Sequence, residues 1–401
     1  MHLSTHFKAY RELLSIRNVR WLFIASLLAN TMFYSTVMVQ YETLRGLNFT
    51  EMFALEAIIS IAAWLFEIPS GIFADRLGYR PTLLLGYASN LASLLLFIIT
   101  RGFWPFALAS ALFGLNLACL SGCEDALIYE SLPQERSAEL SPAAFALLNA
   151  ARNVGFFAGL ATGSFFGTHD PALPFIITLI PLGLAFVAIL RLQSVPRHAQ
   201  LASQNGLAPL STVEFLRSAL QLIRRYPALV SLSLVQSAAF TLVNAIYWYN
   251  QPYFAQAGIA VLWFGPLTAA AVGLSMLVVL TTPAAKKVPG TRMALALSCL
   301  IPGVGYIALA ATRDPLPTVL LIMAIIVGSA WRSTIISDIL NRHIKDGSRA
   351  TTLSVLSFLG ALAGMAFNPL IGYVGDLGLT TTGLGLGTML MLLGLIAYFL
   401  A

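Results

Sequence analysis

Charged residues are scarce in this chain. Only 10% of its 401 residues are Asp, Glu, Lys or Arg, whereas a soluble domain carries about 25%. Acidic residues number 17 in the whole chain, and 58% of all residues are hydrophobic. A surface of this composition is too apolar for water, which excludes a soluble globular protein. We expect an integral membrane protein whose solvent is the lipid bilayer.

Histidine and cysteine are also rare, with 5 and 3 residues. The cysteines lie within apolar runs, and neither residue type shows the spacing of a metal site or of a secreted disulfide framework. The sequence contains no HExxH, GxSxG or P-loop motif, and the glycine-rich stretch 383–388 lies inside an apolar run without a preceding strand. We therefore expect no metal, no cofactor and no enzymatic activity.

The hydrophobic residues form runs long enough to cross a bilayer, which requires about 20 residues per helix. We predict twelve spans, with cores at 21–41, 52–72, 82–100, 104–128, 143–167, 172–190, 228–250, 261–283, 293–311, 316–340, 351–372 and 379–400. The pattern predicts an all-α membrane protein with twelve transmembrane helices in two six-helix bundles. The expected parts are a cytoplasmic N-terminal segment 1–20, a first bundle 21–190, a cytoplasmic linker 191–226 and a second bundle 227–401.

Basic residues are distributed unevenly between the two sides of the predicted membrane. If the N-terminus is cytoplasmic, only Arg45, Arg101 and Arg313 of the 23 basic residues fall in outside loops. Cytoplasmic loops carry an excess of Lys and Arg, so both termini are predicted to be cytoplasmic. The same bias accounts for the net charge of +6, and we expect no nucleic-acid partner.

A polar decapeptide, GIFADRLGYR, lies at residues 71–80 between the second and third spans. It resembles the loop signature between helices 2 and 3 of the major facilitator superfamily, although Tyr79 stands where the family usually has a basic residue. The resemblance implies the fold of that family, in two pseudo-symmetric halves, and an alternating-access transporter whose spans 1, 4, 7 and 10 line a central cavity. It also implies a conformational latch formed by Gly71, Asp75, Arg76, Gly78 and Arg80.

The two halves of the chain contain weak internal repeats. A shift of 212 residues places Gly78 on Gly290. The same shift also matches Arg80 with Arg292, Gly46 with Gly258, and Tyr41 with Tyr253. A shift of 208 residues places 121–132 on 329–340, so that Glu124 matches Arg332 and Glu130 matches Asp338. Similar shifts at corresponding spans indicate duplication, as in transporters built from repeats.

Ionisable residues inside the spans are few, and each costs about 2.5 kcal/mol or more in hydrocarbon. The candidates for proton coupling or charge relay are Glu56, Glu67, Glu124, Asp125, Arg152 and Arg332. Glu56 and Glu67 are 11 residues apart and share a helix face, which we expect to point into the protein. Helix-packing contacts are the alternative interpretation of that face.

Helical phase also suggests a partner for the arginine of span 5. Arg152 lies on the face that carries Gly155, Gly159 and Gly163, and small residues at this spacing allow close helix packing. We predict a buried ion pair between Arg152 and either Glu124 or Asp125, which point about 100 degrees apart on span 4. The pair would serve proton coupling or be purely structural, and the sequence leaves both interpretations open.

Polar and aromatic residues also form stripes along spans 1 and 7. The substrate-cavity candidates are Asn30, Tyr34 and Tyr41 in span 1, and Gln236, Phe240, Asn244, Tyr247 and Gln251 in span 7. Amides and aromatic rings among apolar groups suit a small amphiphilic solute. Ordinary hydrogen bonding between helices is the alternative.

The segments EIPSGIFADRLGYR and SGCEDALIYESL resemble a bacterial drug- or metabolite-efflux branch of the superfamily. That resemblance implies a monomer in the bacterial inner membrane that exports a drug or secreted metabolite in exchange for protons. Two antiporter signatures are incomplete, because span 4 lacks a basic residue and Leu160 follows Gly159. The alternatives are an importer of a nutrient or siderophore-like solute, and a non-transporting membrane sensor or scaffold.

Overall fold

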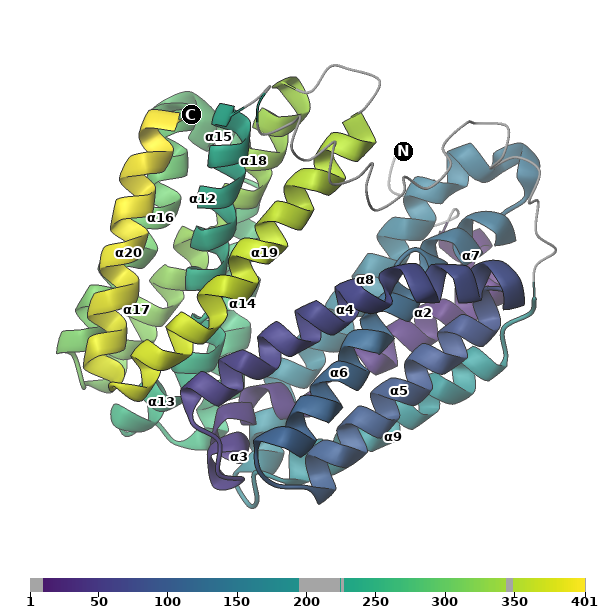
Figure 1. Cartoon of the computed structure of the whole chain (residues 1–401), viewed down its shortest axis with the longest axis horizontal. Coiled ribbons are helices and arrows are strands. Elements are labelled where there is room, and N and C mark those ends of the chain that lie inside the picture. Colours follow the sequence, from purple (N-terminus) through teal and green to yellow (C-terminus); the bar gives the residue numbers. More distant parts are fainter. Residues whose placement is uncertain (1–9, 195–223, 225–226, 344–348, 401) are drawn as a thin grey trace. The chain divides into compact units, whose positions relative to one another are not determined.

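The computed structural model describes residues 10–194, 224, 227–343 and 349–400, and this part of the chain is helical without a strand (Figure 1). Eleven of its helices are long and apolar enough to cross a membrane. The twelfth span is a bent pair, Arg17–Thr36 and Met38–Leu44, with 60° between its parts. The predicted all-α membrane fold is therefore confirmed. Residues 1–9 and most of the predicted linker lie outside the described residues.

The chain divides into two compact units, residues 1–46 with 58–206 and residues 47–57 with 207–401. The first unit contains the first six spans, apart from the start of the second. Its elements are α2 (Arg17–Ala29), η1 (Phe33–Thr36), α3 (Met38–Leu44), most of α4 (Phe49–Leu77), α5 (Tyr79–Ile99), α6 (Phe103–Leu120), α7 (Cys123–Ser131), η2 (Gln134–Arg136), α8 (Ser137–Gly167) and α9 (Leu173–Leu190).

The second unit contains the remaining six spans together with the first turns of α4. Its other elements are α12 (Pro227–Asn244), α13 (Ile246–Gln256), η3 (Val261–Trp263), α14 (Phe264–Val279), α15 (Thr282–Ala285), η4 (Lys286–Gly290), α16 (Thr291–Ala311), α17 (Pro315–Gly328), α18 (Ala330–His343), α19 (Arg349–Asp376) and α20 (Leu379–Leu400).

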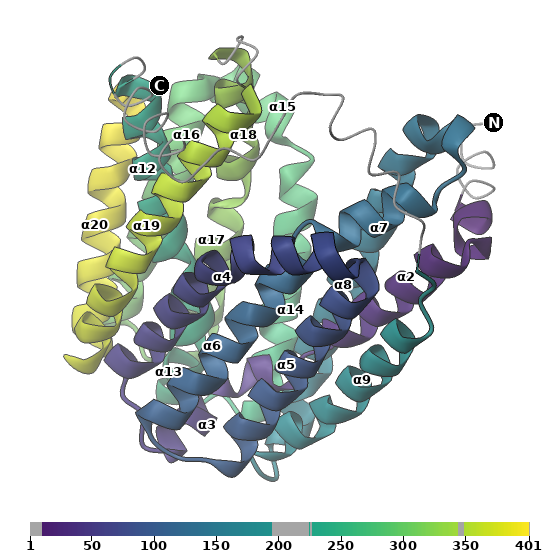
Figure 2. The same ribbon diagram turned by 45° about the vertical axis from the view of Figure 1, so that its right-hand side comes forward.

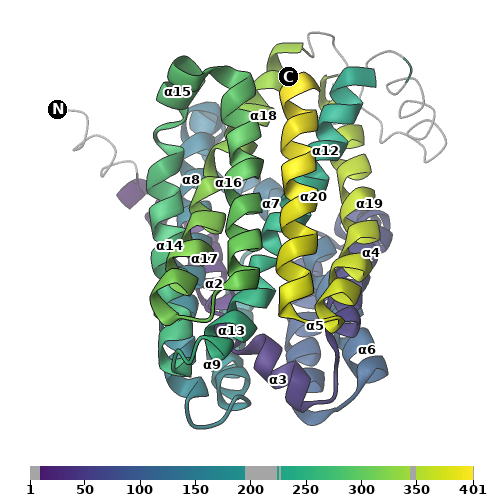
Figure 3. The same cartoon turned by 90° about the vertical axis from the view of Figure 1, so that its left-hand side faces the viewer.

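Corresponding helices pack together in the two units. In the first unit α5 packs against α6 and α9, and α2 packs against α8 and α9 (Figure 2). In the second unit α16 packs against α17 and α20, and α12 packs against α19 and α20 (Figure 3). These are the same pairs of spans, third with fourth and sixth, and first with fifth and sixth. Each unit therefore repeats one packing plan, as the internal sequence repeat predicts.

Matched glycines make the same turns in both units. Gly78 precedes α5 with φ +95°, and Gly290 precedes α16 with φ +82°. Gly46 and Gly258 form a second pair, with φ +94° and +72°. Only glycine adopts such backbone angles without steric cost. Most residues differ in the second copy of the decapeptide, but the glycine that the turn requires is kept.

The first, fourth, seventh and tenth spans are interrupted. Span 1 bends between α2 and α3, and span 4 breaks between α6 and α7 at Gly122, which has φ +70°. Span 7 breaks between α12 and α13 at Ala245, and span 10 breaks between α17 and α18 at Ser329. Non-helical backbone at membrane depth is tolerated where it is buried in protein or lines a cavity. In transporters, such breaks mark binding sites.

The first turn of α4 is capped by a distant carboxylate within the second unit. The Oδ1 of Asp376 accepts a hydrogen bond from the backbone N–H of Phe49 at 2.8 Å, and its Oδ2 accepts one from Thr50 at 3.0 Å. A carboxylate satisfies the unpaired N–H groups of a helix N-terminus and complements its positive dipole end. This contact explains why residues 47–57 group with the second unit.

Candidate functional site

The candidate site begins at the break in span 4. Ser121 and Gly122 end the regular helix of α6, and α7 then starts at Cys123, so Glu124 lies in the first turn of α7. Its side chain is only 2% exposed. The partial positive charge at a helix N-terminus favours a carboxylate in this position. The break between the two helices thus places an acid in the interior of the first unit.

Arg152 of α8 pairs with this buried acid. Its Nη2 donates to Oε2 of Glu124, and its Nη1 donates to the side-chain oxygen of Asn149 at 3.2 Å. The hydroxyl of Tyr87, on α5, donates to Oε1 of Glu124 at 3.5 Å. Three helices therefore contribute to one carboxylate, and the acid has a charged partner and a neutral partner.

Close packing brings α8 into position. Cβ atoms added at Gly155, Gly159 and Gly163 would collide with the backbone of Leu27, Met32 and Phe33. The glycine face identified in the sequence therefore permits the contact of α8 with α2 and η1. Arg152 lies one turn before this face.

The arrangement can hold or release a charge. The Arg152 side chain is 37% exposed, while that of Glu124 is 2% exposed. A carboxylate without a partner is costly in such a buried place, so its charged form depends on the arginine. Any change that moves Arg152 away would favour binding of a proton by Glu124.

The other predicted acids lie elsewhere. Asp125, the alternative partner of Arg152, is exposed. Glu67 is also exposed, and its Oε1 accepts a hydrogen bond from the Ser121 hydroxyl at 3.0 Å. Glu56 is half-buried and belongs to the second unit. Through the bond to Ser121, Glu67 contacts the break in span 4, and the expectation that the shared face of Glu56 and Glu67 points into the protein stays a prediction.

Arg332 occupies the position in the second unit that matches Glu124. It is the third residue of α18, directly after the break in span 10, and is 4% exposed. Its Nε and Nη1 atoms have no hydrogen-bond partner among the described residues. Arg332 and Glu124 lie in different units.

The predicted cavity stripes separate into several environments. Tyr41 is 2% exposed, stacks on Phe175 with ring centroids 4.0 Å apart, and donates to the Phe97 carbonyl at 2.7 Å. Gln251 is also 2% exposed. Both residues are therefore part of a packed core, and neither lines an accessible surface in this structure.

The remaining stripe residues are more accessible. Phe240 is 54% exposed, and Gln236 lines a small gap in the second unit. Half-buried positions are occupied by Asn30, Tyr34, Asn244 and Tyr247. The amide of Asn30 donates to the Ser26 carbonyl at 2.8 Å, the local contact that the alternative interpretation expected.

The predicted latch residues cluster at one end of α4 and α5. Arg80 donates to the Leu190 carbonyl at 2.9 Å, while Gly71, Asp75 and Arg76 are exposed. Gly78 makes the turn. The structure thus ties this loop to the end of α9 through Arg80.

A further contact of this loop occurs in both units. The Tyr79 hydroxyl donates to Oε1 of Glu130 at 3.0 Å, and in the second unit Lys286 pairs with Asp338 at 2.7 Å. Glu130 and Asp338 are the acids that the repeat aligned. Each acid therefore contacts the segment between the second and third spans of its unit, through Tyr79 in the first unit and Lys286 in the second, although these two partners do not align in the repeat.

Two buried polar residues were missed by the sequence analysis. Tyr87 is 1% exposed beside Glu124, and nothing in its apolar run distinguished it from a packing residue. Glu42 is fully buried in α3, just beyond the predicted core 21–41, because the bend in span 1 carries the chain back into the unit. Within the described residues, no group of three or more His, Cys, Asp or Glu side chains could hold a metal ion.

Comparison with known families places the chain among membrane transporters. The model of the Major Facilitator Superfamily matches residues 20–369. The chain therefore belongs to the major facilitator superfamily and is a multi-pass membrane protein that acts on small-molecule solutes. No curated protein matches the chain.

Solved structures of the same fold cover nearly the whole chain. The nucleoside transporter NupG is similar with a TM-score of 0.79 and 16% identity, over 96% of this chain and 99% of that one. A POT family transporter in complex with 5-aminolevulinic acid is similar with a TM-score of 0.68 and 13% identity, over 95% of both chains. At this identity the likeness extends to the fold alone.

Proposed function

We propose that this transporter moves a small amphiphilic organic solute across the bacterial inner membrane by alternating access, in exchange for protons. It works as a monomer with both termini in the cytoplasm, the orientation that the distribution of basic residues favours. The proposed direction is export of a drug or a secreted metabolite, which rests on the sequence resemblance.

The observation that supports proton coupling is the buried pair of Glu124 and Arg152. The acid is 2% exposed and its cation is 37% exposed, so a solute or a helix movement reaches the cation first. Once Arg152 is displaced, the carboxylate is stable only if it binds a proton. Solute and proton would then be linked at one site, as an exchanger requires. The interrupted span supports the same role, since such breaks mark transporter binding sites.

The test uses inside-out membrane vesicles with an acidic interior, and ethidium and carboxyfluorescein as amphiphilic probes of opposite charge. An exporter that exchanges protons accumulates at least one probe in these vesicles, and collapse of the pH gradient stops accumulation. Glu124→Gln is expected to abolish the response to the gradient. Asp125→Asn is the matched control, because it changes an adjacent but exposed acid, and it is expected to keep that response.

Equal, full pH-driven transport in Glu124→Gln would remove Glu124 from proton coupling. Absence of movement of any tested solute would favour the sensor or scaffold alternative.

Uptake is the second candidate, favoured by the structures of nucleoside and peptide transporters that share this fold. Right-side-out vesicles with an acidic exterior, tested with uridine and dialanine, distinguish it. Accumulation there, without accumulation of ethidium or carboxyfluorescein in inside-out vesicles, would replace export by import.

A further inference from the structure

Arg332 is a buried cation in the second unit. It is 4% exposed and lies in the first turn of α18, two residues after that helix begins at Ala330. Its surroundings include the thiol of Cys299 on α16, with which the guanidinium interacts. Cys299 is itself 1% exposed, so the guanidinium lies among helices and not at a solvent boundary.

No carboxylate neutralises this cation among the described residues. Nε and Nη1 of Arg332 are buried without a hydrogen-bond partner. Asp338, which lies further along α18, pairs instead with Lys286. Asp376 caps the first turn of α4. Two acids of this unit are therefore engaged elsewhere.

An unpaired guanidinium in this place is unfavourable for two reasons. Arginine cannot lose its proton in a protein, so burial cannot neutralise it. It also lies in the first turn of α18, where the helix dipole favours an anion over a cation. Glu124, the matched residue of the first unit, has neither disadvantage, because it is an acid at a helix start and has Arg152 as its partner. The second unit has the charge without the partner.

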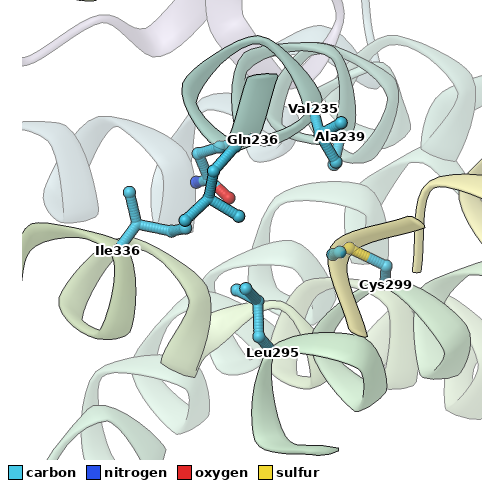
Figure 4. Close-up of a pocket in the computed structure, with 8 residues that line it drawn as sticks. Val235, Gln236, Ala239, Leu295, Cys299 and Ile336 are labelled. Atoms are coloured by element: carbon cyan, nitrogen blue, oxygen red, sulfur yellow. The ribbon is translucent and has the colours of Figure 1, made fainter. Parts of the chain in front are cut away.

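A small gap lies between helices of the second unit, and one of the residues that line it, Cys299, interacts with Arg332 (Figure 4). It is bounded by α12, α16, α18 and α20, and it has no room for a water molecule. The lining residues are Leu232, Val235, Gln236, Ala239, Leu295, Cys299, Ile336 and Ala397. Gln236 is the amide of this lining, and Cys299 is the thiol that interacts with Arg332. Ile336 lies four residues after Arg332, on the same face of α18.

We propose that Arg332, together with the amide of Gln236 from the lining of this gap, forms a subsite for an anionic group of the transported solute, a carboxylate or a phosphate. The inference rests on the proposed function and adds the charge class of the solute. A guanidinium binds such groups through paired N–H donors, and its free Nε and one Nη atom offer that geometry. The gap has no room for a water molecule in this conformation, so an anionic group can enter only after the surrounding helices move apart.

The test compares matched probes on the purified full-length protein in a neutral detergent. Benzoate and benzamide have nearly the same size and shape, but only benzoate is an anion, and inorganic phosphate supplies the second anion class. We expect benzoate or phosphate to raise the Tm in a saturable way, and benzamide to leave it unchanged. Phosphatidylglycerol in the micelle is a separate arm, because a lipid headgroup offers the same phosphate chemistry.

Arg332→Gln is expected to lose the anion-dependent shift of Tm. Arg292→Gln is the matched control, since Arg292 is an exposed arginine of the same unit, and it is expected to keep the shift. Without added anion, Arg332→Gln should have a Tm equal to or above that of the unchanged protein, because it removes an unpaired buried charge. A purely structural arginine would instead lower the Tm when replaced.

The proposal is overturned if neither benzoate nor phosphate shifts the Tm, if Arg332→Gln keeps the shift, or if only phosphatidylglycerol produces it. This binding test needs no gradient and no transport. Anion binding without pH-driven movement of any probe would therefore keep the subsite and reject the coupled transporter. Glu124-dependent transport without anion binding would do the reverse.

Discussion

Nη2 of Arg152 donates to Oε2 of Glu124, and the two side chains differ sharply in exposure, at 37% and 2%. The acid of this pair is therefore shielded, and the cation is its accessible end. A buried ion pair contributes little net stability, but removal of one partner leaves the other charge uncompensated. The pair is thus suited to a role in which its opening, and not its presence, has the large effect.

Arg152→Gln is expected to destabilise the protein at neutral pH by about 3–5 kcal/mol, the cost of a buried charge without its partner. At lower pH, Glu124 in the folded variant binds a proton that the unfolded chain does not bind. Because the folded state then holds more protons, the stability of this variant rises as the pH falls. Thermal unfolding in detergent across a pH series measures both effects.

The control is the double variant of Arg152→Gln with Glu124→Gln. It lacks both charges, so its stability at neutral pH should exceed that of Arg152→Gln and should lose the added pH dependence. If Arg152→Gln alone were as stable as the unchanged protein at every pH, the pair would not neutralise a buried charge.

Gly163→Ala is expected to lower the free energy of unfolding by about 1–3 kcal/mol, the usual cost of overpacking. A Cβ at this position would meet the Phe33 carbonyl and force α8 away from η1. Gly183→Ala on α9 is the control, since a Cβ there meets nothing within 4 Å. Because alanine is the better helix former, this control should gain up to about 1 kcal/mol. Similar stabilities of the two variants would contradict the packing of α8.

Gly78→Ala is expected to cost about 1–2 kcal/mol, the penalty for placing a Cβ at positive φ. Nothing lies within 4 Å of the added atom, so the loss is conformational and not steric. Gly290→Ala should lose a similar amount, since it makes the same turn at φ +82°. Chemical unfolding of both variants measures the loss, and a neutral result at either glycine would show that its turn relaxes freely.

Lys286 and Asp338 should be coupled by up to about 1 kcal/mol in a double-mutant cycle, because both side chains are partly exposed. The cycle uses Lys286→Met, Asp338→Asn and the double variant, with stability measured at low and at high salt. High salt should reduce the coupling energy. The equivalent cycle for Tyr79→Phe and Glu130→Gln concerns a neutral donor and should depend less on salt.

Asp376→Ala is expected to cost about 1–2 kcal/mol, the range measured for lost helix N-caps. The change removes acceptors from the N–H groups of Phe49 and Thr50 at the start of α4. Asp376→Asn keeps one acceptor and should lose less. Hydrogen exchange at Phe49 and Thr50 provides the local measurement, and unchanged protection in Asp376→Ala would exclude the cap.

Sequence reasoning predicted the helices well because the bilayer imposes a length and a composition on each of them. It also predicted that Arg152 meets an acid of span 4, but it left Glu124 and Asp125 as alternatives. Adjacent residues point about 100 degrees apart on a helix, and nothing local says which direction is covered. The break at Gly122 restarts the helix and turns Glu124 inward, while Asp125 stays exposed.

The sequence by itself determined the membrane class, the number of spans, the internal repeat and the family. Hydrophobic length, matched glycines and a loop signature can all be recognised from the order of the residues alone. Only the tertiary structure decided that Glu124 has a charged partner and that Arg332 has none in the part of the chain that the structure describes. Burial and pairing depend on side chains from several helices at once, and residues 28 positions apart must meet before a charge is neutralised. The two units share one packing plan. They differ in the buried charge at the matched position, since Glu124 has an oppositely charged partner and Arg332 has none among the described residues.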